Sequence, residues 1–434
     1  MLAALSTSQP QQSGKLQPGF KHNLPAQLTS LIGREQEVAT ACQLLRHPQV
    51  RLLTLTGPGG VGKTRLAVQV AAALLDDFAD GISFISLASI SDPHLVVSTL
   101  AQAFELREEG KRPLLDRLKL TLQTSQQLLV IDNFEQVVEA APLLVDLLTA
   151  CPNLKIVVTS REVLRIRGEH EFVVPPFALP DVQRMAQVKT GLAVVLAHNA
   201  AITLFVERAQ AVKPDFQLND ENALAIAEVC ARLDGLPLAI ELAAARIKLF
   251  SPQALLAKLS GQMGRSSLQL LTSGSRDMPA RQRTLRDTIQ WSYDLLAESE
   301  QQLFRQLSVF VGGFTPAAAE AVVGGSKLEA GIWRIEYKES PATIYYPLSS
   351  ILDSIASLHD KSLLQPMSPS EPTDDEPRLT MLVTLREFAA EQLKQSEEAM
   401  AVQRAHAAYY LHLVEETAPR LFGPVQKSWL DRLE

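Results

Sequence analysis

The stretch GPGGVGKT at residues 57–64 matches the full GxxxxGK[ST] pattern of a phosphate-binding loop, or P-loop. It follows an apolar run that predicts a strand, Leu52 to Thr56, and it opens a predicted helix, Thr64 to Leu75. Glycines let the backbone wrap phosphates with its N–H groups inward, and the helix N-terminus adds a positive dipole end. The stretch therefore predicts a purine nucleoside triphosphate site, with Lys63 on the β- and γ-phosphates and the Thr64 hydroxyl on Mg²⁺.

The residues of this segment expected to contact the nucleotide are Gly57, Gly59, Gly60, Val61, Gly62, Lys63, Thr64 and Arg65. A P-loop also needs an acid at the tip of a neighbouring strand to hold the water shell of the metal, and Asp132, which ends the run LLVID, supplies it. A structural alternative is that Asp132 only caps the next turn. Asn133 stands where many active NTPases carry a second carboxylate, so Glu135 is the nearest candidate for a catalytic base and slow hydrolysis is expected.

A further candidate follows the run KIVVTS at residues 155–160. Arg161 would lie at the same sheet edge as Asp132, where ligands gather in open α/β folds, and would sense the γ-phosphate. The structural alternative is an ion pair with Glu162 or with a neighbouring carboxylate on the surface.

Apolar runs alternate with helical patterns from Arg51 to Pro175, which is typical of βαβ units around a parallel sheet. The predicted strands are Leu52–Thr56, Ile82–Leu87, Leu128–Asp132, Lys155–Thr159 and Glu171–Val174. The predicted covering helices are Thr64–Leu75, Asp116–Thr124 and Ala140–Ala150.

Strand patterns vanish after Pro180, and amphipathic helices follow. A first set predicts a helical subdomain: Ala200–Val212, Glu221–Leu233, Leu236–Leu249 and Pro252–Leu259. A second set predicts a winged-helix domain: helices at Ile289–Leu296, Ser299–Leu307, Pro316–Val323, Leu348–Lys361 and Val383–Gln395, with short strands at Leu363–Pro366 and Arg378–Leu382. The two strands flank an acidic loop, Ser368 to Pro377, that resembles a wing, and Lys327 to Pro347 looks like an insertion.

The fold class predicted is thus an α/β P-loop NTPase with a parallel sheet, followed by a helical subdomain, a winged-helix domain and the start of an α-helical, TPR-like region. The expected boundaries are 1–22 for a disordered leader, 23–190, 191–262, 263–284 for a linker, 285–395 and 396–434. The last helix ends on WLDRLE without a cap, which suggests a cut before further helical hairpins.

The composition limits the class of protein and its cellular location. Hydrophobic residues make up 46% and charged residues 21%, as in globular proteins, and the net charge of −7 gives no overall footprint for nucleic acid or anionic lipid. No run approaches the about 20 apolar residues that cross a bilayer, and no secretory signal is recognised. Three scattered cysteines and the absence of an HExxH motif argue against disulfides and transition metals. A cytoplasmic protein is expected.

Five motifs in order resemble the STAND NTPases of the NB-ARC (AP-ATPase) type, which include apoptosome proteins, plant disease-resistance proteins and large bacterial transcriptional regulators. They are LIGREQE, the P-loop, LLVIDNFE, VVTSRE and GLPLAIELAAARI, and the likeness covers roughly residues 24–395. The resemblance implies that Ile32 and Arg34 flank the adenine, that Arg161 is the first sensor, and that Pro237 packs on the base or ribose. Asn133 departs from the usual pair of acids. Standing alone, the GLPL stretch is also ordinary helix punctuation.

The resemblance implies a switch in which ADP holds the subdomains closed, while exchange for ATP opens them and exposes a self-association surface. An inducer or protein partner would act through the C-terminal helices, and hydrolysis would be slow at most. A conventional turnover NTPase or P-loop kinase is the alternative. A third hypothesis has the winged helix reading DNA, but the helix Leu348–Lys361 has charges of mixed sign, so DNA contact is expected only through a region missing from this chain.

Overall fold

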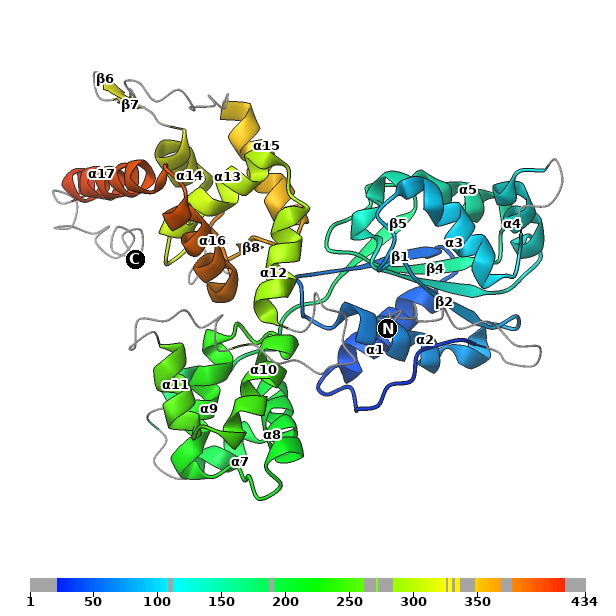
Figure 1. Ribbon diagram of the computed structural model, residues 1–434, viewed down its shortest axis with the longest axis horizontal. Coiled ribbons are helices and arrows are strands. Elements are labelled where there is room, and N and C mark those ends of the chain that lie inside the picture. The colour runs from blue at the N-terminus through cyan, green and yellow to red at the C-terminus, as the bar shows by residue number, and fades with distance from the viewer. Residues whose placement is uncertain are drawn as a thin grey trace, which may run out of the picture. The chain divides into compact units, whose positions relative to one another are not determined.

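The computed structural model describes residues 22–107, 112–185, 187, 191–260, 271, 284–324, 327–329, 332–335, 348–367 and 377–417 (Figure 1). It forms two compact units, each described here by itself. The first comprises Met1–Gly57 and Gly62–Pro175, and the second comprises Pro58–Val61 and Pro176–Glu434. The predicted leader, nearly all of the predicted linker, the acidic loop at 368–376 and the end of the last helix at 418–434 lie outside the described residues.

The first unit is built on a parallel sheet with the strand order β2-β3-β4-β1-β5. The strands are β1 (Leu52–Thr56), β2 (Ile82–Ser86), β3 (Leu128–Asp132), β4 (Lys155–Thr159) and β5 (Glu169–Val173). Residues of β1 and β3 are buried along their whole length, because helices cover both faces of the sheet. The predictions for β1, β3 and β4 are confirmed to the residue, while β5 begins two residues earlier than expected.

Helices cover the two faces of this sheet (Figure 1). They are α1 (Glu35–Arg46), α2 (Lys63–Ala73), α3 (Val96–Ala103), α4 (Leu114–Leu122) and α5 (Pro142–Ala150), with short 3-10 turns at Leu75–Asp77, Pro93–Leu95, Phe134–Gln136 and Val138–Ala140. The helices α3, α4 and α5 pack against one face in a continuous apolar core, which includes Leu100, Leu118 and Leu144. The P-loop helix, α2, contacts β3 and β4. Neither α1 nor α3 was predicted.

The second unit begins with helices, as the loss of strand patterns after Pro180 predicted. They are α6 (Val182–Met185), α7 (Leu192–Leu196), α8 (Ala200–Val212), α9 (Asp220–Arg232), α10 (Pro237–Ala244) and α11 (Pro252–Leu259). The expectation of one helix over Leu236–Leu249 is wrong, since α10 ends at Ala244 and the chain tightens into a 3-10 turn, Ala245–Lys248. The side chains of Asn199, Asn219 and Ser251 cap α8, α9 and α11.

The rest of the second unit combines helices with short hairpins. Its elements are α12 (Leu285–Asp294), α13 (Glu298–Gln306), a 3-10 turn (Leu307–Val309), α14 (Pro316–Val323), β6 (Lys327–Glu329), β7 (Ile332–Ile335), α15 (Leu348–Asp360), β8 (Gln365–Pro366), β9 (Leu379–Thr380), α16 (Val383–Gln395) and α17 (Ala399–Thr417). The strands β8 and β9 pair antiparallel around the predicted wing loop but hold only two residues each, shorter than predicted. The winged-helix assignment itself stays a prediction. In the described part of the chain, no helix is long and apolar enough to cross a bilayer.

Candidate nucleotide-binding site

The P-loop backbone takes conformations that require glycine. Gly57, Gly60 and Gly62 have φ values of 141°, 84° and 97°, a region that L side chains rarely adopt. A Cβ atom built on Gly62 would meet no described atom within 4 Å, so the backbone angle and not space selects glycine there. Gly62 is also the N-cap of α2, where the first N–H groups of the helix have no partner within the helix. The loop therefore leaves room for an anion at this helix end.

Lys63 is the first residue of α2, and its Nζ donates a hydrogen bond to the carbonyl oxygen of Gly57 at 2.6 Å. The ammonium thus reaches back across the loop, as a lysine that contacts phosphates must. Burial lowers the pKa of Lys63 to about 8; Glu135 and Asp132 oppose that shift, and Arg161 adds to it. An anionic ligand would stabilise the charged form of this half-buried lysine.

The structure brings Thr64 and Asp132 together, although they are 68 residues apart. The Thr64 hydroxyl donates to Asp132 Oδ1 at 2.6 Å, and the hydroxyl of Thr159 donates to the same oxygen at 2.6 Å. Asp132 ends β3 and is only 5% exposed, so the two hydroxyls orient a carboxylate that water barely reaches. Thr159 was not singled out from the sequence; its place at the end of β4, beside β3, was the available signal.

Glu135 and Arg161 also meet, each 8% exposed. Arg161 Nε lies 3.5 Å from Glu135 Oε1, and Asn133 Nδ2 donates to the same oxygen at 3.3 Å. No donor among the described residues reaches the other carboxylate oxygen, Oε2, although it is buried. A buried acceptor without a donor costs free energy that a bound water or hydrated metal would relieve. The structural alternative for Arg161 was an ion pair with a carboxylate on the surface. Arg161 does pair with a carboxylate, that of Glu135, but this pair is buried.

These observations fit a nucleotide with its magnesium ion. The glycines of the loop have the required conformations, and Lys63 lies across the loop. Thr64 donates a hydrogen bond to Asp132, and the buried oxygen Oε2 of Glu135 has no hydrogen-bond donor among the described residues. Oxygen ligands of this kind suit Mg²⁺, which keeps several of its waters when it binds to proteins.

The guanidinium of Arg65 binds the segment that precedes α1. Its Nη2 donates to the carbonyl oxygens of Thr29 and Ser30 and to the Thr29 hydroxyl, each at 2.9 Å. Gln27 Nε2 returns a hydrogen bond to the Arg65 carbonyl oxygen at 3.1 Å. The guanidinium thus holds the segment before α1 against α2, and the contact of Arg65 with the nucleotide stays a prediction.

Among the residues named by resemblance as purine contacts, Arg34 is anchored by other groups of the first unit. Arg34 is 3% exposed, and its guanidinium donates to Glu37 Oε1 at 2.7 Å and to the Pro175 carbonyl oxygen at 2.6 Å. Ile32 lies half-buried just before it. In the second unit, Pro237 is half-buried as the first residue of α10, the place that helix punctuation predicts. Their contact with a base stays a prediction.

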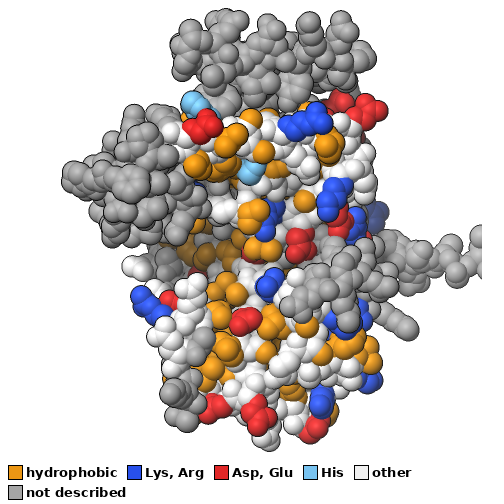
Figure 2. Space-filling model, turned by 90° about the vertical axis from the view of Figure 1, so that its left-hand side faces the viewer, with side chains coloured by type: hydrophobic (Ala, Val, Ile, Leu, Met, Phe, Trp, Pro, Cys, Tyr) orange, Lys and Arg blue, Asp and Glu red, His pale blue; other side chains and the backbone are white. Residues whose placement is uncertain are grey.

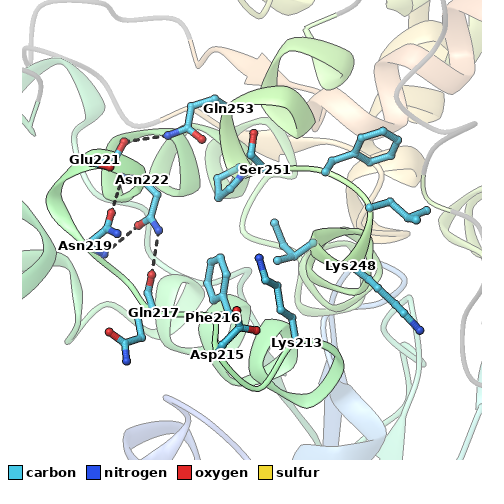
Figure 3. Close-up of a pocket in the computed structure, with 14 residues that line it drawn as sticks. Lys213, Asp215, Phe216, Gln217, Asn219, Glu221, Asn222, Lys248, Ser251 and Gln253 are labelled. Carbon is cyan, nitrogen blue, oxygen red and sulfur yellow. Dashed lines mark hydrogen bonds between the residues drawn. The ribbon is translucent and has the colours of Figure 1, made fainter.

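A concavity of about 420 Å³ lies within the helical part of the second unit (Figure 3). Its floor includes the buried Phe216, Ile247 and Pro252, and exposed residues such as Lys213 and Glu221 surround it. Asn219 and Asn222 exchange hydrogen bonds with each other's backbone as the capping box of α9, so their polar groups serve the helix. None of the residues predicted for the nucleotide lines this concavity.

The parallel sheet, the P-loop between β1 and α2, and the aspartate that ends β3 define a P-loop NTPase. The comparisons agree. A model of the AAA domain family matches residues 47–165, which contain the P-loop, Asp132, Glu135, Thr159 and Arg161. The putative HTH-type transcriptional regulator Rv0890c of Mycobacterium tuberculosis is 39% identical over 366 residues, 84% of this chain and 36% of that protein. The chain therefore spans 36% of the length of this regulator.

A second relative matches along most of its length. The uncharacterized protein Rv0894 of Mycobacterium tuberculosis is 33% identical over 394 residues, 91% of this chain and 88% of that protein. A solved STAND protein with a tetratricopeptide repeat sensor, PH0952 of Pyrococcus horikoshii, aligns with 14% identity and a TM-score of 0.34 over 93% of this chain and 47% of that one. The chain belongs to the family of Rv0894, and its first unit carries a P-loop NTPase domain.

Proposed function

We propose that this chain is an ATP- and ADP-binding switch whose nucleotide exchange controls opening and self-association. The observation that carries the proposal is the contrast within one site. The groups that bind phosphate and metal, Lys63, Thr64 and Asp132, are assembled, whereas the candidate base Glu135 is held by Arg161 and Asn133. Such a site favours retention of nucleotide over rapid turnover.

Each residue has a part in this proposal. Lys63 binds the β- and γ-phosphates, and the P-loop amides surround them. Thr64 and Asp132 hold Mg²⁺ and its waters, and the ion, when bound, neutralises charge on the phosphate oxygens. A γ-phosphate would compete with Glu135 for the Arg161 guanidinium, so ATP and ADP would leave the Arg161–Glu135 pair in different arrangements. Differential contacts of this kind are what a ligand needs to shift an equilibrium between two states.

The larger setting is proposed from the relatives. Rv0890c is named as a putative HTH-type transcriptional regulator, so we place this chain in a transcriptional regulator whose DNA contacts lie in a region outside it. An inducer or protein partner would act through the C-terminal helices. The face of the second unit in Figure 2 has Lys, Arg, Asp and Glu intermixed around hydrophobic patches, which favours protein contacts over phosphate binding on that face.

The test measures nucleotide affinity by calorimetry and identifies the nucleotide that co-purifies by denaturing the protein and separating the released base. Lys63→Ala is expected to weaken ADP and ATP binding roughly 10–100-fold, because charge-assisted hydrogen bonds to phosphate are lost. Lys155→Ala is the matched control: Lys155 also donates to main-chain carbonyls, of Leu45 and His47, but lies at the opposite end of the sheet. A protein that carries no nucleotide and a Lys63→Ala variant with unchanged affinity would refute the proposal.

Turnover NTPase activity is the second candidate, and the buried, unsatisfied Glu135 Oε2 is the observation that favours it. A carboxylate oxygen without a donor is able to accept a proton or orient a water. Steady-state hydrolysis of roughly 1–100 per second without a partner would support this candidate, and the switch predicts a much slower rate.

A further inference from the structure

The loop between α9 and α10, residues 233–236, supplies an N-cap to a distant helix in the second unit. Asp234 Oδ1 accepts from the Val383 amide at 2.9 Å, and Oδ2 accepts from the Thr384 amide at 2.9 Å and the Thr384 hydroxyl at 2.8 Å. These amides begin α16, whose own N-cap residue, Leu382, has an apolar side chain that cannot accept a hydrogen bond. The first turn of α16 is therefore held by a carboxylate about 150 residues earlier in the chain.

The backbone holds Asp234 in an unusual conformation. Asp234 has a φ of 55° and Gly235 a φ of 65°, so two consecutive residues are left-handed. Such a conformation costs a non-glycine residue of order 1 kcal/mol and persists only where the surroundings enforce it. The Phe177 amide donates to the Gly235 carbonyl oxygen at 3.0 Å, and a Cβ on Gly235 would lie 2.4 Å from the Phe177 carbonyl oxygen. The aspartate is therefore aimed at α16 by a backbone that tolerates little movement.

The first turn of α10, which directly follows this loop, contacts the P-loop. The Leu238 amide, in the first turn of α10, donates to the Gly60 carbonyl oxygen at 3.1 Å, and both residues belong to the second unit. A Cβ on Gly60 would lie 3.0 Å from Leu238 Cβ, so glycine is needed for this approach as well as for its φ. The pentapeptide Asp234–Leu238 thus connects the phosphate loop at one end with the first turn of α16 at the other.

The charged form of the Asp234 carboxyl group depends on the hydrogen-bond donors at the start of α16. Burial raises the pKa of its carboxyl group and the Glu387 carboxylate adds to that rise, while the amides of Thr384 and Val383 and the Thr384 hydroxyl lower it. A buried carboxylate near another acid would be unfavourable without these donors. If α16 moved away, the Asp234 carboxylate would lose these donors. The hydrogen bonds between Asp234 and α16 are therefore sensitive to small movements of the helix.

We propose that Asp234 is a positioning residue that couples the P-loop to α16, so that a change at Gly60 on nucleotide exchange alters how firmly the first turn of α16 is held. The inference rests on the proposed nucleotide switch and adds the residue through which the switch reaches α16. An aspartate that merely capped a helix would stabilise α16 equally in every nucleotide state.

The experiment compares hydrogen exchange of the α16 amides in the full chain, with and without ADP, for three proteins. In the unaltered protein, ADP should slow exchange at Val383–Phe388 by roughly tenfold, the effect of about one charge-assisted hydrogen bond. Asp234→Asn should remove most of this difference while changing ADP affinity less than about threefold. Thr315→Val, which removes the Thr315 cap of α14 in the same unit, should leave the ADP-dependent difference intact.

A milder variant guards against misfolding of Asp234→Asn. Thr384→Val removes the hydroxyl donor but keeps both amide donors, and it should reduce the ADP-dependent difference partly. The inference is overturned if the difference persists in Asp234→Asn, if Thr315→Val abolishes it equally, or if ADP binds without affecting α16 in the unaltered protein. If no ADP binds at all, the proposed function fails, and this inference fails with it.

Discussion

Two carboxylates, Glu300 in the second unit and Glu135 in the first, are each 8% exposed. They differ in how many hydrogen-bond donors the protein supplies to them. Glu300 accepts from Lys361 Nζ at 2.6 and 2.7 Å, from the Ser357 hydroxyl at 2.5 Å and from the Ala297 amide at 2.9 Å. Glu135 has only contacts of 3.3 and 3.5 Å at one oxygen, and none from the described residues at the other.

The difference separates a structural site from a ligand site. At Glu300 the protein supplies every donor itself, so α13 and α15 are held together and nothing remains for a ligand. At Glu135 the protein leaves an acceptor open at the cost of stability, beside a lysine whose pKa burial lowers to about 8. Perturbed and unsatisfied groups of this kind gather at functional sites. Changes around Glu135 should therefore affect nucleotide binding, whereas changes around Glu300 should affect folding.

The largest effect is expected at the metal-holding aspartate. Asp132→Ala should weaken Mg–ATP binding roughly 100-fold and abolish the difference between measurements with Mg²⁺ and with EDTA, because the acid that orients the metal's waters is gone. Calorimetric titration of ATP in both conditions checks this. Thr159→Val is the matched control, since it removes one hydroxyl donor but keeps the carboxylate, and its loss should be smaller. Equal affinities with and without Mg²⁺ in the unaltered protein would argue against the metal site.

The next effect concerns stability. Glu300→Gln should lower the free energy of opening of α13 and α15 by about 2 kcal/mol, because Lys361 loses its ion pair in a buried place. Native-state hydrogen exchange of amides in the two helices measures this locally, without assuming that the whole chain unfolds in one step. Nucleotide affinity should stay within about twofold of the unaltered protein. A variant with unchanged exchange but weakened nucleotide binding would reverse the roles assigned to the two clusters.

The matching substitution in the first unit, Glu135→Gln, should destabilise the protein much less than Glu300→Gln. Glu135→Gln is expected to change the stability of the first unit by less than about 1 kcal/mol, because the glutamate makes no short hydrogen bond that the variant would lose. Urea unfolding followed by circular dichroism, in the absence of nucleotide, provides the comparison. If Glu135→Gln destabilised the protein as much as Glu300→Gln, the distinction between the two clusters would be broken.

The sequence predicted those elements and residues whose local pattern is distinctive. The strands β1, β3 and β4 were predicted to the residue because strands buried on both faces are continuously apolar, and Asp132 stood out because it ends such a run after a P-loop. The helix α3 was missed because it begins with Val96-Val97, β-branched residues that favour strands. The helix α1 buries only Ala41, Cys42 and Leu45, which is too narrow an apolar face for a clear pattern.

Contacts that depend on tertiary structure could not be found from local pattern. Thr159 is an ordinary strand residue until β4 is placed beside β3, and Arg65 follows the P-loop motif but uses its guanidinium on Thr29. The aspartate before the GLPL motif gives no hint that it caps a helix about 150 residues later. Motifs identify the groups whose chemistry is shared by all P-loops, whereas the supporting partners depend on how this particular chain packs.

The smallest effect is a dependence on pH of the stability around Glu300. Although burial raises the pKa of Glu300, its hydrogen bonds with Lys361, Ser357 and Ala297 outweigh that rise, so the pKa lies below its ordinary value of about 4.5. A carboxyl group with a lowered pKa stabilises the folded state above its ordinary pKa, and this contribution is lost as the pH falls through the folded value. The difference in opening free energy between the unaltered protein and Glu300→Gln should therefore be constant from about pH 7 to pH 5.5 and shrink below about pH 4.5. Hydrogen exchange of α13 amides across this range measures the difference, with the rates corrected for the intrinsic pH dependence of exchange. A difference that grew on acidification would require a raised pKa at Glu300, and the donors around it would then not stabilise its charge.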